Sequence, residues 1–256
     1  MISENILTSQ KVAKIRAMKG REKIAVLTAY DFAMARWLDE LNIPILLVGD
    51  SLGMVVLGYE DTTQVTMAEM EHHTRAAARA QPRALLIADL PFQSYATPEM
   101  AVQNARRLIS AGAEAIKAEG GKMILAQVRA LVKEGIPFLG HLGMLPQHVR
   151  EEGGYHVKGK TISEQEELLA DAQALNDAGA FAIVLELITP LVAQQITEKI
   201  PIPTIGIASG KNCDGQILVT TDLLGTSPGF IPKHVKPKYT IAQQMKEAIL
   251  KWKKNI

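Results

Sequence analysis

The residues best suited to chemistry stand directly after short apolar segments. The segments LLVGDS, LLIADL, AIKAEGG, PFLGHLG and IVLEL each end in ionisable or hydroxyl side chains, namely Asp50, Ser51, Asp89, Lys117, Glu119, His141 and Glu186. One such residue alone is as often a helix cap or a solvated loop residue. Several in succession predict a functional cluster, because a buried ionised group needs a partner or a metal.

The composition of this set favours a metal ion with oxygen ligands. Carboxylates predominate, and no cysteine is among them. Mg²⁺ prefers one or two carboxylates together with water and substrate oxygens, whereas zinc sites contain more histidine or cysteine. We expect Asp50 and Asp89 to hold a divalent cation that chelates a 2-oxo acid and stabilises its enolate. Lys117 would neutralise the substrate carboxylate, and Glu186 would remove the proton next to the carbonyl.

Eight repeats of a strand followed by a helix are expected to position these residues. The predicted strands are short, apolar on both faces and bounded by Gly, Pro or charge, as buried parallel strands are. They cover Ile24–Thr28, Ile45–Gly49, Ala84–Ala88, Ala115–Ala118, Pro137–Gly140, Phe181–Leu185, Thr204–Ala208 and Gln216–Thr220. Eight units in 256 residues match an α/β fold of the (β/α)₈ TIM-barrel type, in which strand carboxyl ends form the active face. The main alternative is an open, doubly wound sheet.

Helices are predicted between the strands and at both ends of the chain. Those after the first strand cover Asp31–Leu41, Met67–Ala80, Pro98–Ser110, Lys122–Lys133, Ser163–Asn176, Pro190–Glu198 and Thr240–Lys253. Thr97 before Pro98 is typical of a helix start, and Ser163 with Glu166 reads as a capping box. No linker rich in Pro, Gly or Ser divides the chain, so residues 1–256 are predicted to form one barrel domain with an N-terminal helix.

Composition excludes several classes of protein. Lys and Arg total 28 and Asp and Glu total 27, so no overall field favours nucleic acid. The only cysteine, Cys213, excludes an intramolecular disulfide framework. No apolar run approaches the roughly 20 residues of a membrane span, and the first twenty residues lack the apolar core of a secretory signal. We expect a soluble, cytoplasmic protein.

Other segments admit both a functional and a purely structural interpretation. The Gly-containing segments 119–122 and 209–211 are candidates for anion binding. The first is equally explained as a tight turn, and the second is only a weak signal for phosphate. The polar, Gly-rich segment Glu151–Thr161 follows the fifth strand and is a candidate lid or a surface loop. Cys213 has no neighbouring activator in sequence, so a role as nucleophile is disfavoured.

Motifs along nearly the whole chain resemble those of the ketopantoate hydroxymethyltransferase family. In order they are LTAYD, VGDSLGMVVLGY, VTMAEMEHHT, ADLPF, KAEGG, GHLGMLPQ, GGYHVKGK, LE, IGIASG with DGQILV, and FIPKHVK, from Leu27 to Lys236. GDSLGM and GHLGMLPQ are specific signals. The resemblance departs at Ala208–Ser209, where a second Gly is typical, and at Lys211–Cys213, so no residue is assigned to folate binding.

The resemblance implies an enzyme that transfers a hydroxymethyl group from 5,10-methylenetetrahydrofolate to 3-methyl-2-oxobutanoate. The product is 2-dehydropantoate, in the first committed step of pantothenate and coenzyme A synthesis. It also implies a Mg²⁺-dependent barrel that assembles as a homo-oligomer, a decamer. Carried over by motif, the metal residues are Asp50, Asp89 and Glu119, the contacts to the 2-oxo acid are Asp50, Ser51, Asp89 and Lys117, and the general base is Glu186. His141 receives no role beyond lining the site.

Two alternatives stay open. A Mg²⁺-dependent C–C lyase or mutase of the phosphoenolpyruvate mutase and isocitrate lyase type shares the oxo-acid chemistry, and segment 209–211 would then hold phosphate. Those lyases generally carry a catalytic cysteine in a motif that this chain lacks. A non-catalytic protein that binds an oxo acid is the second alternative, and it has no need of Glu186.

Overall fold

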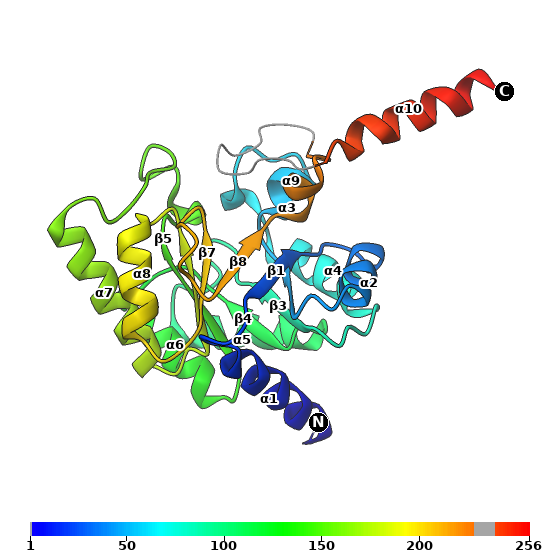
Figure 1. The fold of residues 1–256 in the computed structure, drawn as a ribbon. Coiled ribbons are helices and arrows are strands. Elements are labelled where there is room, and N and C mark those ends of the chain that lie inside the picture. The colour runs from blue at the N-terminus through cyan, green and yellow to red at the C-terminus, as the bar shows by residue number, and fades with distance from the viewer. Residues whose placement is uncertain (1, 228–238) are drawn as a thin grey trace.

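Eight parallel strands close into a barrel in sequence order (Figure 1). The computed structural model describes residues 2–227 and 239–256. Each strand pairs with the next, and β8 pairs with β1. The strands are β1 Ile24–Thr28, β2 Ile45–Val48, β3 Leu85–Asp89, β4 Ala115–Lys117, β5 Phe138–Gly143, β6 Ala182–Glu186, β7 Thr204–Ile207 and β8 Gly215–Leu218. The predicted barrel is therefore confirmed, and an open sheet is excluded.

Helices surround the barrel and connect its strands (Figure 1). The α-helices are α1 Ile2–Ala17, α2 Phe32–Glu40, α3 Leu52–Val55, α4 Met67–Ala78, α5 Pro98–Ser110, α6 Leu125–Lys133, α7 Ile162–Asp177, α8 Pro190–Lys199, α9 Thr220–Leu224 and α10 Ile241–Lys254. Short 3₁₀ turns are η1 Thr62–Gln64, η2 Lys122–Ile124 and η3 Pro146–His148. Among the described residues, none of these helices is both long enough and apolar enough to cross a membrane.

Two predicted helix starts have different outcomes. Thr97 caps α5 as expected, because its side chain accepts a hydrogen bond from the Met100 amide. The predicted Ser163–Glu166 capping box is wrong, since α7 begins earlier and Thr161 forms the box with Glu164. Glu164 also accepts a hydrogen bond from the Lys160 amide at 2.7 Å, which fixes the chain one residue further back.

Side chains alternate between the inside and the outside of the barrel, as they must along a strand. The inward-facing apolar residues form one cluster that includes Ile24, Val26, Ile45, Leu47, Leu85, Ile87, Ala115, Leu139, Ala182, Val184, Ile205 and Ile217. Outward-facing residues such as Leu86, Ile116 and Leu185 pack in a second cluster with the helices. On β3, β4, β5 and β6 the next inward-facing position after these apolar residues, two residues further along, is polar. These residues are Asp89, Lys117, His141 and Glu186.

The strand β5 is longer than predicted, which changes the place of His141. The predicted strand ends at Gly140, whereas β5 continues to Gly143. His141 is therefore a strand residue, paired in register with Val184, and it follows Leu139 on the inner face. A polar residue ended the strand in the prediction. In the barrel it remains in the strand because carboxylates from neighbouring elements face it.

Helix α1 closes the amino end of the barrel. Ile15 and Met18 join the inner cluster, and the Lys19 ammonium donates to the Asp214 carboxylate at 2.8 Å. The same carboxylate accepts hydrogen bonds from the Thr204 amide and hydroxyl at 2.9 and 3.2 Å. Asp214, the residue before β8, thus ties β7 to the segment that follows α1, which joins the N-terminal helix to the last strands of the barrel.

We expect Asp214→Asn to destabilise the fold by about 2 kcal/mol, because the amide lacks the charge and one acceptor oxygen needed by its buried partners. Urea-induced unfolding would measure the change. Glu40→Gln is the control, since Glu40 pairs with Arg36 on the surface, where both side chains are about 60% exposed, and such pairs contribute little. Equal midpoints for Asp214→Asn and the parent protein would contradict this role of Asp214.

Candidate active site

The structure brings the predicted polar residues together at the carboxyl ends of the strands. Asp89, Lys117 and Glu186 are the last residues of β3, β4 and β6. They face inward because they continue the alternation of the core residues before them. Asp50 and Glu119 follow β2 and β4, and both are buried.

Lys117 and Asp89 form the central ion pair of the site. They are register partners on adjacent strands, and Lys117 Nζ lies 2.8 Å from Asp89 Oδ1. Burial alone would lower the pKa of Lys117, but the carboxylate charges of Asp89, Glu119 and Asp50 outweigh it and raise the pKa above its usual value. Lys117 is therefore a permanent cation in the site.

Asp50 lies beside Asp89 in a surplus of negative charge. Its amide donates to Asp89 Oδ2 at 3.2 Å. Burial, followed by the charges of Asp89 and Glu119, raises the pKa of the Asp50 carboxyl well above its usual value. A second cation would relieve this repulsion, so the chemistry of the donor set fits a divalent metal ion with oxygen ligands.

Glu119 has its closest polar partners outside the pair of aspartates. Its Oε2 accepts a hydrogen bond from the Gln147 amide at 3.0 Å, and its Oε1 lies 3.6 Å from His141 Nδ1. Within the described residues, no three His, Cys, Asp or Glu side chains form a group placed to hold a metal as they stand. Of the predicted metal residues, Asp50 and Asp89 are therefore adjacent, and Glu119 points to other partners.

His141 lies between two glutamates. Its Nε2 is 3.1 Å from Glu186 Oε2, on the side opposite Glu119. Burial and the charge of Lys117 lower the pKa of His141, but the two carboxylates outweigh them and raise it to about 9. The ring is thus protonated at neutral pH. The Glu186 side chain is 13% exposed, which makes it more accessible than the side chains of His141 and Glu119.

Sequence reasoning did not single out three buried residues of the site. The Tyr30 hydroxyl lies 2.9 Å from Ser51 Oγ, and burial raises the pKa of Tyr30. Tyr95 and Gln147 hydrogen-bond to each other beside Asp50 and Glu119. Tyr30 and Gln147 fall within the motifs LTAYD and GHLGMLPQ, which were the available signal. Tyr95 falls in none of these motifs.

The loop after β5 lies next to the site. Arg150 pairs with Asp61 at 2.6 Å, which attaches the loop to the connection after β2. The Lys158 amide donates to Leu187 O at 2.8 Å, which attaches the other end to the connection after β6. Burial and the charge of Glu186 raise the pKa of Tyr155, which lies between these attachments. A role of segment 151–161 as a moving lid stays a prediction.

The two Gly-containing segments have structural partners. The Lys122 amide donates to Asp171 Oδ1 at 3.1 Å, so a carboxylate of α7 accepts a hydrogen bond from the turn at residues 119–122. The Ser209 hydroxyl donates to Leu185 O at 2.8 Å and accepts from the Ile188 amide at 3.0 Å. These contacts favour the tight-turn interpretation of segment 119–122, and they show that the Ser209 hydroxyl has protein partners. Cys213 is buried, and burial raises the pKa of its thiol.

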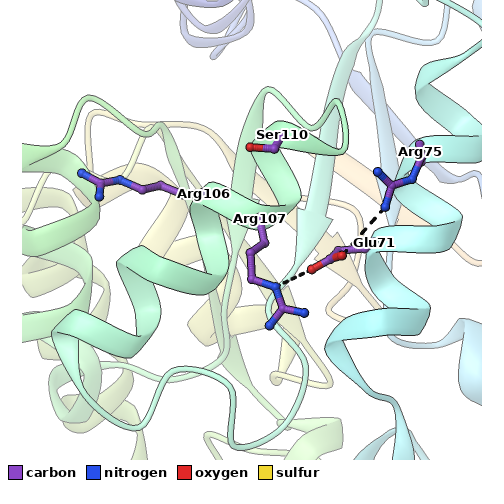
Figure 2. A pocket seen from close by; sticks show the side chains of 5 residues that line it. All are labelled: Glu71, Arg75, Arg106, Arg107 and Ser110. Atoms are coloured by element: carbon purple, nitrogen blue, oxygen red, sulfur yellow. Dashed lines mark hydrogen bonds and ion pairs between the residues drawn. The ribbon is translucent and has the colours of Figure 1, made fainter.

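A separate hollow of about 310 Å³ lies between α4 and α5, on the outer wall of the barrel (Figure 2). Its lining residues are Glu71, Arg75, Arg106, Arg107 and Ser110. Glu71 lies between two of the arginines, 2.5 Å from Arg107 Nε and 3.8 Å from an Arg75 nitrogen. This cluster joins two helices on the surface and shares no residue with the polar set at the strand ends.

Comparisons with known proteins identify relatives over almost the whole chain. The family model described as ketopantoate hydroxymethyltransferase matches residues 9–256. A 3-methyl-2-oxobutanoate hydroxymethyltransferase from Ignicoccus hospitalis is 49% identical over 243 residues, 94% of this chain and 92% of the relative. The enzyme of the same name from Carboxydothermus hydrogenoformans is 51% identical over 241 residues, 93% of this chain and 87% of the relative.

Solved structures share the fold at much lower sequence identity. A putative phosphonomutase from Burkholderia cenocepacia superposes with a TM-score of 0.66 at 17% identity, covering 97% of this chain and 100% of the other. A 2,3-dimethylmalate lyase of the phosphoenolpyruvate mutase and isocitrate lyase superfamily gives 0.62 at 17% identity, covering 95% and 88%. At such identity these likenesses establish the barrel and nothing about the chemistry.

We expect Lys117→Met to cost about 3–5 kcal/mol of stability in metal-free protein, because it leaves buried carboxylates without their nearest cation. The double variant Lys117→Met, Asp89→Leu should recover most of this loss, since an apolar pair of similar volume replaces the ion pair. Urea unfolding in EDTA measures both variants. If the single variant is as stable as the parent protein, the ion pair does not balance the charge of this site.

Proposed function

The chain belongs to the ketopantoate hydroxymethyltransferase family, and we propose that it transfers a hydroxymethyl group from 5,10-methylenetetrahydrofolate to 3-methyl-2-oxobutanoate. The product is 2-dehydropantoate, the first intermediate on the route to pantothenate and coenzyme A. The observation that carries the proposal is the match over residues 9–256, with relatives about half identical over more than nine-tenths of the chain. The inward-facing acid, base and cation set at the strand ends supplies side chains suited to this chemistry.

A divalent cation, Mg²⁺, is proposed to bind at Asp50 and Asp89. The support is their adjacency, their burial and the raised pKa of Asp50 in the surrounding negative charge. When bound, such an ion supplies Lewis-acid stabilisation of the negative charge on the enolate of a 2-oxo acid. Glu119, turned toward His141 and Gln147, would act in the outer shell of the ion.

The 2-oxo acid is proposed to contact Ser51 and Lys117. The Lys117 ammonium has three donors, and one of them is used by Asp89. The remaining donors are suited to the carboxylate of a substrate in the barrel mouth. Ser51 Oγ is held by the Tyr30 hydroxyl and does not cap the helix that it precedes, so its hydroxyl is oriented by the site.

Glu186 is proposed to remove the proton from C3 of the substrate. It ends β6 on the inner face, and its carboxylate is partly accessible. His141 Nε2 lies 3.1 Å from Glu186 Oε2, which places the imidazole beside one oxygen of this carboxylate. Contacts that strengthen as charge develops on the substrate raise turnover instead of merely tightening binding.

The family match favours the transferase over the alternatives. The solved structures with the same fold include lyases and mutases, but at 14–19% identity they support only the fold. The cysteine of this chain is buried in the loop before β8, at the amino end of that strand, away from the carboxyl ends where the polar set lies. A non-catalytic binding protein would leave the placement of Glu186 unexplained.

We also propose that the chain forms a homo-oligomer, in line with the decamer that the family resemblance implies. Helix α10 has no buried residue and extends away from the barrel (Figure 1). Its exposed large apolar residues are Met245, Ile249, Leu250 and Trp252, and Ile256 just beyond its end is exposed as well. An apolar surface of this kind on a helix with no buried residue favours burial against another protein surface.

The barrel offers a surface for this helix in a second copy of the chain. Outward-facing residues of β2, β3 and β4 are buried under helices, whereas Ala25 on β1 and Gln216 on β8 are exposed. The five-residue α9 is the only described helix between β8 and α10, so the described residues give the wall beside β1 and β8 little helical cover. We propose that α10 of a second copy covers this wall.

Glu186→Gln should slow exchange of the C3 proton of 3-methyl-2-oxobutanoate at least 100-fold, because the amide cannot accept it. The measurement is loss of the C3–H signal by NMR in D₂O with Mg²⁺, without folate, and with EDTA in a parallel sample. Glu71→Gln, on the outer wall, is the control and should exchange at the parent rate.

Normal exchange in Glu186→Gln would identify another base. If the parent protein itself shows no exchange, 5,10-methylenetetrahydrofolate is added to the same sample. Appearance of 2-dehydropantoate then means that proton removal waits for the folate, and its absence contradicts the proposed activity.

Ile249→Asp should reduce the mass of the assembly, because a charge replaces an apolar residue that we place in an interface. Size-exclusion chromatography with light scattering measures the mass. Gln244→Asp introduces the same charge at a polar position of α10 and should leave the assembly intact. A monomeric parent protein, or equal masses for the parent and Ile249→Asp, would count against the proposed contact.

A further inference from the structure

Gln147 uses all the hydrogen-bonding groups of its side chain inside the site. Its Nε2 donates to Asp50 Oδ2 at 2.7 Å and to Leu90 O at 2.9 Å. Its Oε1 accepts a hydrogen bond from the Tyr95 hydroxyl at 2.6 Å. The side chain is almost fully buried, at 2% exposure, so water does not substitute for these partners.

These three partners allow only one orientation of the amide. Rotation by 180° would place Oε1 against the Asp50 carboxylate and the Leu90 carbonyl, which are both acceptors. Such an arrangement would leave buried acceptors facing each other without a proton, which is costly. The donor pair of Gln147 is therefore fixed toward Asp50.

The backbone of Gln147 holds a second carboxylate. Its amide donates to Glu119 Oε2 at 3.0 Å. One residue in η3, after β5, thus binds carboxylates that follow β2 and β4. Tyr95 is positioned in turn by Gln127, whose Nε2 donates to Tyr95 O at 3.2 Å. The geometry couples four connections of the barrel through Gln147.

We propose that Gln147 is a positioning residue that orients Asp50 and Glu119 for the divalent cation, and that Tyr95 fixes its amide. This inference rests on the proposed function, because it assigns Gln147 to the metal site of that reaction. Asp50 is surrounded by the like charges of Asp89 and Glu119, and a neutral donor holds one of its oxygens without adding charge. The other oxygen is left for the ion.

Partners of this kind behind metal ligands commonly change metal affinity 10- to 100-fold when removed. Gln147→Leu keeps the approximate volume of the side chain and removes both donors and the acceptor. We expect it to weaken Mn²⁺ binding at least tenfold. Tyr95→Phe removes only the hydroxyl that orients the amide, and we expect a smaller change in the same direction, about threefold.

Binding is measured directly on the full-length protein by EPR detection of free Mn²⁺, without substrates. A kinetic readout accompanies it, in which the Mg²⁺ concentration for half-maximal activity rises with the same ratio while kcat at saturating Mg²⁺ falls much less. A general loss of packing would instead lower kcat at saturating Mg²⁺ as strongly as it lowers metal affinity. Unfolding midpoints report whether each variant is folded.

Thr204→Val is the matched control. Thr204 is fully buried and hydrogen-bonded to Asp214, at the amino end of β7 and the opposite end of the barrel. The substitution also removes a buried polar group, so it should lower stability. It should leave Mn²⁺ affinity within twofold of the parent.

Folded Gln147→Leu that binds Mn²⁺ as the parent does would overturn the inference, as would an equal loss of affinity in Thr204→Val. If Gln147→Leu does not fold, Tyr95→Phe decides, and unchanged affinity there overturns the proposal. Parent protein with Mg²⁺-dependent transferase activity and unaffected variants would refute only the role of Gln147. Parent protein that neither binds Mn²⁺ nor turns over would refute the proposed function as well.

Discussion

The site depends on balancing charge at the end of an apolar barrel interior. Asp50, Asp89 and Glu119 are buried together, and carboxylates so enclosed are costly unless cations or donors face them. Lys117 supplies one positive charge and His141, protonated between two glutamates, supplies another. The negative charge that remains around Asp50 makes the site fit a divalent ion. The same carboxylates therefore create the need for charge balance and the proposed chemistry.

Neutral donors orient some of the carboxylate oxygens. The side-chain and backbone amides of Gln147 donate to Asp50 and Glu119, and the Tyr95 hydroxyl donates to Gln147. These donors orient oxygens without altering the net charge. A site that must accept a cation benefits from this arrangement, because added positive side chains would compete with the ion. The connections that carry these donors are anchored to one another around the barrel mouth.

The outer wall divides into complete and incomplete parts. Most strands are covered by the helix that follows them. Asp214 attaches the N-terminal helix region at the amino end of the barrel, opposite the mouth. Among the described residues, the cover beside β1 and β8 is thin, while α10 extends away from the barrel and carries exposed apolar side chains. Helix α10 and the wall beside β1 and β8 both have exposed residues that a second copy of the chain could bury. This supports association between copies, and it is independent of the chemistry at the barrel mouth.

The sequence alone indicated the barrel, the order of its strands and the ionisable residues at their carboxyl ends. Short apolar runs bounded by Gly or charge identify buried strands, and the period of two places Asp89 and Lys117 on the inner face two residues after Ile87 and Ala115. Family motifs assigned Asp50 and Glu186 their expected roles. These features are local, so they can be read from neighbouring residues.

Only the tertiary structure decided which side chains meet. It extended β5 through His141, replaced the expected cap at Ser163 by Thr161, and brought Tyr95 and Gln147 together across 52 positions of sequence. Contacts between distant residues depend on barrel closure and strand register, which no local pattern specifies. The sequence thus indicated the ionisable groups at the mouth, and the closed barrel decided their partners, because hydrogen bonds and charge pairs act over distances of a few ångströms in space.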